Sequence, residues 1–244
     1  MKKRIVAAYI ISAEALRIQL SLNSILNFVD KVYIIWSPRD IETVKEIQKL
    51  NSTKIEIILE PLFDPNDKGL NGKVRNEYLK ILKEKEIGSW CLVLDGDEIV
   101  DETTIYDIQS TLDQLEAQQF YCVSPRIRHL IRTLGWEDAT REKHYVPCRL
   151  FKVKQDLWYP EEEHNVLRGY DIVYELDTIV IWHMSSMYDI FYEYKKYLNN
   201  KVKSIVHTEQ YLETWKRDQI LGTYPVKKVY KSELPEVLID YFKL

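Results

Sequence analysis

The sequence predicts an α/β fold: a mainly parallel, twisted sheet flanked by helices, with antiparallel additions and a helical C-terminal appendage. In the first half of the 244 residues, short apolar runs typical of buried strands alternate with segments of helical periodicity. Strands that alternate with crossover helices favour a parallel sheet with helices on both faces. After about residue 118 the strand-like segments lengthen and helices become few, which favours antiparallel additions.

The first half contains the clearest elements. Apolar segments predict four strands, at residues 5–11, 32–36, 55–59 and 90–94, of which the first and the last are typical of buried strands. Apolar residues at helical spacing predict helices within 15–29, 41–50 and 74–82. We expect Ser12 to cap the first of these helices and Gly88 to close the third. The composition of residues 61–69, rich in Pro, Asp and Asn, predicts a loop.

The second half predicts longer strands at 120–131, 149–158 and 172–182, followed by a helical region from residue 189. The chain has no internal repeat and no linker rich in Gly or Ser. We therefore expect one domain over residues 1–187, with a helical appendage over residues 188–244 packed on the same domain.

Composition and charge exclude several classes of protein. The net charge is −4, from 34 basic and 38 acidic residues that are interspersed, which argues against a nucleic-acid partner. The three cysteines, Cys91, Cys122 and Cys148, form no CxxC pair and argue against a zinc knuckle or a disulfide framework. No apolar run approaches the roughly 18 residues of a membrane span. These features predict a cytoplasmic protein.

The seven glycines restrict how a phosphate could be bound. They form no GxGxxG turn, and the segment from Gly69 to Lys73 is too short for a P-loop. If nucleotide phosphates bind to this chain, a metal ion or side chains must therefore hold them.

The sharpest feature is the block Asp95-Gly96-Asp97-Glu98, which directly follows a strand-like run. Ligands of open α/β sheets bind at the carboxyl ends of strands. Clustered carboxylates repel one another unless a cation neutralises them, and Mg²⁺ or Mn²⁺ is the usual partner. His183 ends another apolar run and is a candidate third ligand if the two strands are neighbours. The plainer interpretations are a solvated acidic turn and a hydrogen-bonded edge histidine.

These residues belong to an ordered set that resembles a known family. The set consists of Ala13-Glu14, Arg75-Asn76, residues 90–98, Arg149-Leu150-Phe151, Glu163-His164 and the strand ending at His183. It resembles the family 2 glycosyltransferases of the GT-A fold over about residues 4 to 200. The resemblance implies that residues 1–187 form a nucleotide-sugar-binding domain.

The resemblance also implies roles for individual residues. Asp97 would ligate the metal, Asp95 would contact the donor ribose or the metal, and His183 would complete the coordination. Arg75 would lie near the nucleotide, and Arg149 near the diphosphate or the sugar. The plainer interpretations of the arginines are a solvated helix-face charge and a strand-edge ion pair.

The sequence departs from the family pattern at three places. Ala13 stands where the family usually has Asn. Family members often have an acid at the end of the second strand, which helps to recognise the base, whereas here that strand ends at Trp36 and Asp40 lies four residues downstream. Trp36 is therefore a candidate to stack on the nucleotide base, or else an ordinary core residue. His164 is followed by Asn165 rather than by Glu, but it keeps its place among the candidate donor-binding residues.

The implied activity is inverting, metal-dependent transfer of a sugar from a UDP- or GDP-sugar to a hydroxyl of a glycan or lipid-linked saccharide. Inversion by single displacement needs a carboxylate base, for which Asp138 and Glu163 are the candidates. The alternatives are another metal-dependent phosphate enzyme, such as a sugar nucleotidyltransferase, and a non-catalytic binding protein of the same fold. Four lysines within residues 195–203 suggest contact with an anionic membrane surface at the inner face of the membrane, or a solvated helix face.

Overall fold

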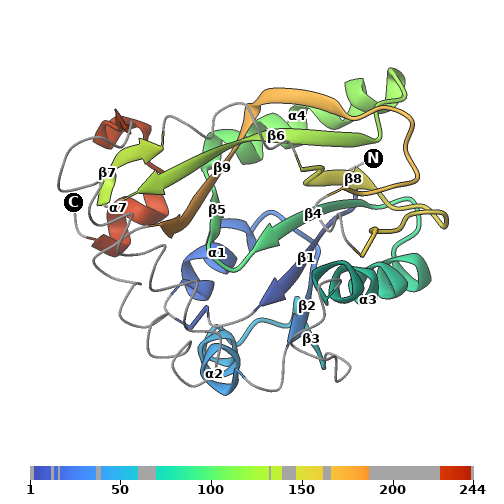
Figure 1. Cartoon of the computed structure of the whole chain (residues 1–244), viewed down its shortest axis with the longest axis horizontal. Helices are drawn as coiled ribbons and strands as arrows, with labels where there is room; N and C mark the ends of the chain where they lie inside the picture. Colours follow the sequence, from blue (N-terminus) through green and yellow to red (C-terminus); the bar gives the residue numbers. More distant parts are fainter. Residues whose placement is uncertain are drawn as a thin grey trace.

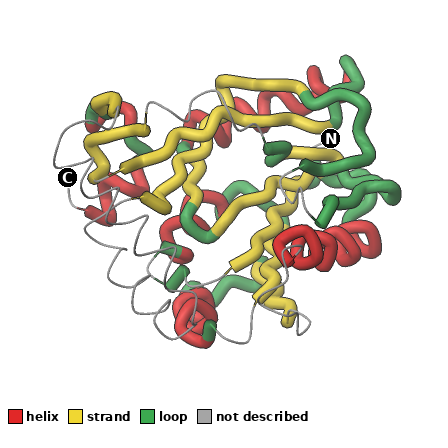
Figure 2. Tube along the Cα trace, viewed as in Figure 1, coloured by secondary structure: helices red, strands yellow, loops and turns green. Residues whose placement is uncertain are grey.

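The computed structural model describes residues 3–11, 14–15, 17–36, 40–59, 70–131, 133–138, 147–161, 166–186 and 226–242. They form a twisted, mixed sheet flanked by helices (Figures 1 and 2). The strand order is β10-β7-β6-β8-β4-β1-β2-β3, and β9 pairs with both β5 and β6. The predicted α/β fold class is confirmed.

The first half of the chain forms the parallel part of the sheet. Its strands are β1 (Ile5–Ile11), β2 (Lys31–Trp36), β3 (Ile55–Leu59) and β4 (Trp90–Asp95). All of them run parallel in the order β4-β1-β2-β3. The helices between them are α1 (Ile18–Ile25), α2 (Ile41–Lys49) and α3 (Leu70–Lys85). The four predicted strands and three predicted helices are therefore confirmed.

The start of α1 differs from the expectation. The helix begins after Arg17, and no side chain caps its amino end. Ser12, the expected cap, lies outside the described residues, as does the expected loop at 61–69.

Two cores explain why the central strands are apolar throughout. Along β1, Ile5, Ala7 and Tyr9 belong to one buried cluster, which also contains residues of α1, α2 and α4 (Glu102–Ala117). The alternate residues Val6 and Ala8 belong to a second cluster, which contains residues of α3. Because successive side chains of a strand point to opposite faces, a strand covered on both faces must be apolar at every position.

The second half adds antiparallel strands, as predicted. These elements are β5 (Glu98–Val100), β6 (Cys122–Ile131), β7 (Thr133–Asp138), β8 (Leu150–Lys152) and β9 (Tyr174–Ser186). β8 runs antiparallel to β4 and β6, whereas β9 runs parallel to β6 and antiparallel to β5. The expectation of a long strand over 149–158 is wrong, because β8 ends at Lys152 and the chain then enters a turn.

The C-terminal residues 226–242 pack beside β9 and α1. They form β10 (Val226–Lys228), which pairs with β7, then η1 (Lys231–Glu233) and α7 (Glu236–Phe242). Leu234 and Leu238 share a buried cluster with Leu20 of α1 and Trp182 of β9. The lysine-rich segment 195–203 lies outside the described residues. Within the described parts of the chain, no helix has the length and apolar character needed to cross a membrane.

Two of the three cysteines form a bridge that the sequence pattern did not indicate. Cys122 of β6 is joined by a disulfide to Cys148, which lies two residues before β8. Cys91 remains free and buried in β4. An odd number of cysteines excludes complete pairing, but it does not exclude one bridge between strands that the sheet brings together.

Glu116 of α4 links the helix to the sheet, and its contribution to the stability of the fold depends on pH. It accepts hydrogen bonds from Trp90 Nε1 and from Lys152 Nζ, both at 2.9 Å, and pairs with Lys3. Burial alone would raise the pKa of Glu116, but these donors outweigh it and lower the pKa to about 2. The stabilisation is therefore complete above the unfolded-state pKa near 4.5 and is lost as the pH falls through 2.

We predict that Glu116→Gln lowers the free energy of unfolding at pH 7 by about 1–2 kcal/mol, because two ammonium groups lose their charged acceptor. Urea unfolding of variant and wild type should show this deficit shrinking between pH 4.5 and 2. Glu42→Gln, which changes an exposed ion pair on α2, is the control with no resolvable effect. A deficit that stays constant with pH would contradict the prediction.

Candidate functional site

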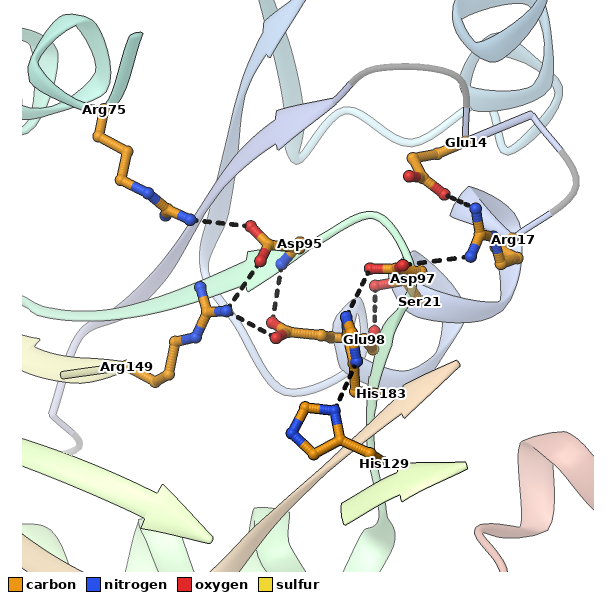
Figure 3. A network of polar contacts seen from close by, with 10 residues as sticks. All are labelled: Glu14, Arg17, Ser21, Arg75, Asp95, Asp97, Glu98, His129, Arg149 and His183. Carbon is orange, nitrogen blue, oxygen red and sulfur yellow. Dashed lines mark hydrogen bonds and ion pairs between the residues drawn. The ribbon is translucent and has the colours of Figure 1, made fainter. Parts of the chain in front are cut away.

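The candidate site lies at the carboxyl end of β4, where the chain turns into β5 (Figure 3). Asp95 is the last residue of β4, Gly96 and Asp97 form the turn, and Glu98 begins β5. β5 pairs antiparallel with β9, which places Glu98 opposite His183. The backbone N–H of Met184 donates to the carbonyl of Asp97 at 2.9 Å, so β9 also holds the turn. The two predicted parts of the site are therefore neighbours.

Asp95 is held between two buried arginines. Arg75 of α3 places Nη2 3.2 Å from Asp95 Oδ1, and Arg149 places Nη2 2.8 Å from Asp95 Oδ2. Burial would raise the pKa of Asp95, but Arg149 and Arg75 outweigh it and hold the pKa well below its usual range. Asp95 is consequently ionised at any physiological pH.

Glu98 fixes the geometry of the turn through hydrogen bonds to Arg149 and to the backbone of Asp95. Its Oε1 accepts from Arg149 Nη2 at 2.6 Å, and its Oε2 accepts from the backbone N–H of Asp95 at 2.8 Å. The residue is almost fully buried, and this burial raises the pKa of Glu98 to about 8. Glu98 therefore positions Arg149 and Asp95.

Asp97 is oriented by a second ion-pair chain that begins next to α1. Arg17 Nη1 lies 3.1 Å from Asp97 Oδ2, and Arg17 Nη2 lies 2.7 Å from Glu14 Oε2. All three residues are buried. The ion pair fixes one oxygen of Asp97, and the other oxygen, Oδ1, faces His183 (Figure 3).

Asp97 Oδ1 and His183 Nε2 are 3.6 Å apart. Two ligand atoms bound to one octahedral Mg²⁺ or Mn²⁺ through bonds of about 2.1 Å lie about 3.0 Å apart in adjacent positions and about 4.2 Å apart in opposite ones, so a shift of about 0.6 Å would let this pair share a cation. Within the described residues, no group of three or more His, Cys, Asp and Glu side chains is arranged to hold a metal. The remaining ligands would have to be substrate phosphates or water, as is usual for Mg²⁺.

Of the other predicted donor-side residues, the structure describes Trp36. Trp36 ends β2, and its Nε1 donates to the backbone carbonyl of Asp40 at 2.8 Å. Asp40 is buried and caps α2 by accepting from the N–H of Thr43, so this acid has a structural role. Asn76 of α3 makes a reciprocal pair of 2.9 Å hydrogen bonds with the backbone of Tyr159.

The side chains of the two predicted bases, Asp138 and Glu163, lie outside the part of the structure that is described. Asp138 is the last residue of β7, and its backbone pairs with Val226, but its side chain is not described. Glu163 and His164 lie outside the described residues.

Sequence reasoning missed Arg17 and His129, both of which contact the predicted metal ligands. Arg17 adjoins an apolar helix face, where a charged residue is unusual. This unusual position was the signal that could have identified it. His129 lies in the middle of β6 and places Nδ1 2.8 Å from His183 Nδ1. Nothing in its local sequence marks it, because the contact depends on the pairing of β6 with β9.

Comparisons with known proteins leave the family open. No family model and no curated protein matches the sequence. Similar solved structures include 4-diphosphocytidyl-2C-methyl-D-erythritol synthase from Anaerococcus prevotii, with 12% identity and a TM-score of 0.44 over 83% of this chain and 97% of that one. A protein from Desulfovibrio desulfuricans, named as a nucleotide-diphospho-sugar transferase, has 9% identity and a TM-score of 0.43 over 76% and 83% of the two chains.

A mannose-6-phosphate isomerase from Helicobacter pylori has 14% identity and a TM-score of 0.38, and the match covers 63% of this chain and 62% of that one. With identities and TM-scores this low, the likenesses leave the activity to be argued from the site itself.

The close contact between Glu14 and Gly96 gives a test of how tightly residue 14 packs on the turn. A Cβ on Gly96 would lie 2.7 Å from Glu14 Cγ and 2.8 Å from its Cβ, closer than carbon atoms can approach. We predict that Gly96→Ala lowers the free energy of unfolding by about 1–3 kcal/mol through overpacking. Urea unfolding should show part of this cost disappearing in the Glu14→Ala background, because Cγ is then absent.

Gly88→Ala is the matched control, because its cost comes from a φ of +84° and no atom lies within 4 Å of the added Cβ. Its effect should be the same in the wild-type and Glu14→Ala backgrounds. Strict additivity of Gly96→Ala and Glu14→Ala would contradict the packing argument.

Proposed function

We propose that this chain is a metal-dependent, inverting glycosyltransferase of the family 2 kind, which moves a sugar from a nucleotide-diphosphate sugar to an acceptor hydroxyl. The observation that carries the proposal is the placement of Asp97 Oδ1 and His183 Nε2, 3.6 Å apart at the carboxyl edge of the sheet, beside two buried arginines. A divalent cation bound there would stabilise the charge that develops on the diphosphate as the sugar leaves.

Asp95 supplies a fixed negative charge beside the proposed cation. Because its pKa is well below the usual range, it is a permanent acceptor. Each carboxylate oxygen has two acceptor positions, so Asp95 can accept from a ribose hydroxyl while it keeps its arginine. This supports a donor-binding role for Asp95 and leaves Asp97 and His183 as the proposed metal ligands.

Arg75 and Arg149 supply positive charge where the sequence has no glycine cradle for phosphates. Both guanidinium groups are buried and held in place by Asp95. An arginine that is already oriented loses less conformational entropy when it binds an anion. We propose that these two residues lie at the diphosphate and nucleotide end of the donor, with Trp36 and His164 as further donor contacts.

We predict that the purified protein, with Mn²⁺ or Mg²⁺, releases nucleoside diphosphate from at least one UDP- or GDP-sugar in a screen with glycan and lipid-linked acceptors. EDTA should abolish the release, and added Mn²⁺ should restore it. Asp97→Asn should lower the rate at least about 100-fold, because a charged transition-state interaction is removed. Asp113→Asn, at a side chain that is 86% exposed, is the matched control and should leave the rate unchanged.

The products of the same assay separate the rival activity. A sugar nucleotidyltransferase would release pyrophosphate from a nucleoside triphosphate and a sugar phosphate. Pyrophosphate release without diphosphate release would replace the proposed glycosyl transfer by that activity. If Asp97→Asn releases diphosphate or pyrophosphate as fast as the wild type, the proposed site is overturned.

The catalytic base is tested by a second pair of variants. We predict that one of Asp138→Asn and Glu163→Gln lowers acceptor-dependent turnover about 100-fold or more while binding of the nucleotide-diphosphate sugar is retained. The reason is that the base removes the proton of the attacking hydroxyl and is not needed to bind the donor. Near-wild-type turnover in both variants would exclude both residues as the base.

A further inference from the structure

His183 touches a second histidine on the neighbouring strand. β6 and β9 run parallel with His129 opposite His183, and the two imidazole rings meet edge to face with centroids 4.8 Å apart. The Nδ1 atoms are 2.8 Å apart, which is hydrogen-bonding distance (Figure 3). Asp97, His183 and His129 therefore form a continuous row of polar contacts.

The direction of this hydrogen bond determines what His183 can do. A neutral imidazole carries one N–H, on either Nδ1 or Nε2. If His183 donates from Nδ1, its Nε2 presents a lone pair toward Asp97. If His129 donates instead, the proton of His183 lies on Nε2, and that atom cannot ligate a cation.

We propose that His129 is a positioning residue that accepts the Nδ1–H of His183 and so keeps the Nε2 lone pair of His183 directed at the cation site. The inference rests on the metal site of the proposed function. Histidines that bind metals usually donate their other N–H to a carboxylate, a backbone carbonyl or water, which fixes the ring and its tautomer. Here the acceptor is a second imidazole.

The packing on the opposite face of these strands holds the pair in register. Arg128, the neighbour of His129, lies with its guanidinium 4.2 Å from the ring centroid of Trp182, the neighbour of His183. Arg128 also pairs with Glu233 at 3.2 Å, and Trp182 Nε1 donates to Asp101 at 3.2 Å. Since alternate residues of a strand point to opposite faces, this contact fixes β6 against β9 without occupying the histidine face.

The first experiment measures binding of Mn²⁺ alone, by the electron paramagnetic resonance signal of free Mn²⁺, so it needs no sugar donor. We expect His129→Phe to weaken binding about 10- to 100-fold, as is typical when the partner of a ligating histidine is lost. His129→Asn, whose amide oxygen can still accept, should recover most of this loss. Tyr106→Phe, at an exposed side chain of α4, is the control with unchanged affinity.

The second experiment reads the tautomers directly, with saturating Mg²⁺, which is diamagnetic. ¹⁵N imidazole shifts, at about pH 8 where an ordinary histidine is neutral, should show the proton of His183 on Nδ1 and the proton of His129 on Nε2, so that His129 Nδ1 is the acceptor. Circular dichroism should show that His129→Phe retains the fold.

The outcomes separate the two proposals. A proton on Nδ1 of His129 in the Mg²⁺-bound protein, or unchanged Mn²⁺ affinity in His129→Phe, would overturn the role of His129 and leave the proposed function standing. Mn²⁺ affinity that is absent in the wild type, or equal in wild type and His183→Ala, would overturn the metal site itself, and the role of His129 with it.

Discussion

The candidate site depends on the compensation of buried charge. Asp95 and Asp97 lie at the end of a central strand, and arginines from three separate parts of the chain hold their carboxylates: Arg17 before α1, Arg75 in α3 and Arg149 before β8. Removing one partner of a buried ion pair typically costs about 3–5 kcal/mol, because the other charge is left uncompensated. The same contacts that shape the site therefore also fix α1, α3 and β8 against the sheet, and substitutions at the site will affect both stability and chemistry.

The parallel half of the fold could be predicted from the sequence, because β1, β2 and β4 are largely apolar and buried, and β3 has four apolar residues in five although it lies at the edge of the sheet. The elements β5 and α4 were missed, for different reasons. β5 has three residues and begins with the buried carboxyl of Glu98, so it has too few positions for a pattern. The helix α4 has Ile108, Leu112 and Leu115 at helical spacing with Asp101 as its cap, so its signal was present in the sequence and was not used. The bridge between Cys122 and Cys148 depends on pairing between β6 and β8, which no local pattern reports.

The site was predictable where its residues end strands, and unpredictable where they reach it from other elements. Asp97 and His183 both follow apolar runs, and the structure confirms that they meet, although β9 reaches the turn by pairing with β5 rather than with β4. From the sequence, a divalent cation was expected to neutralise the clustered acids. The structure shows that arginines provide much of it. What supports a cation is therefore no longer acid repulsion but the geometry of one carboxylate oxygen facing one imidazole nitrogen.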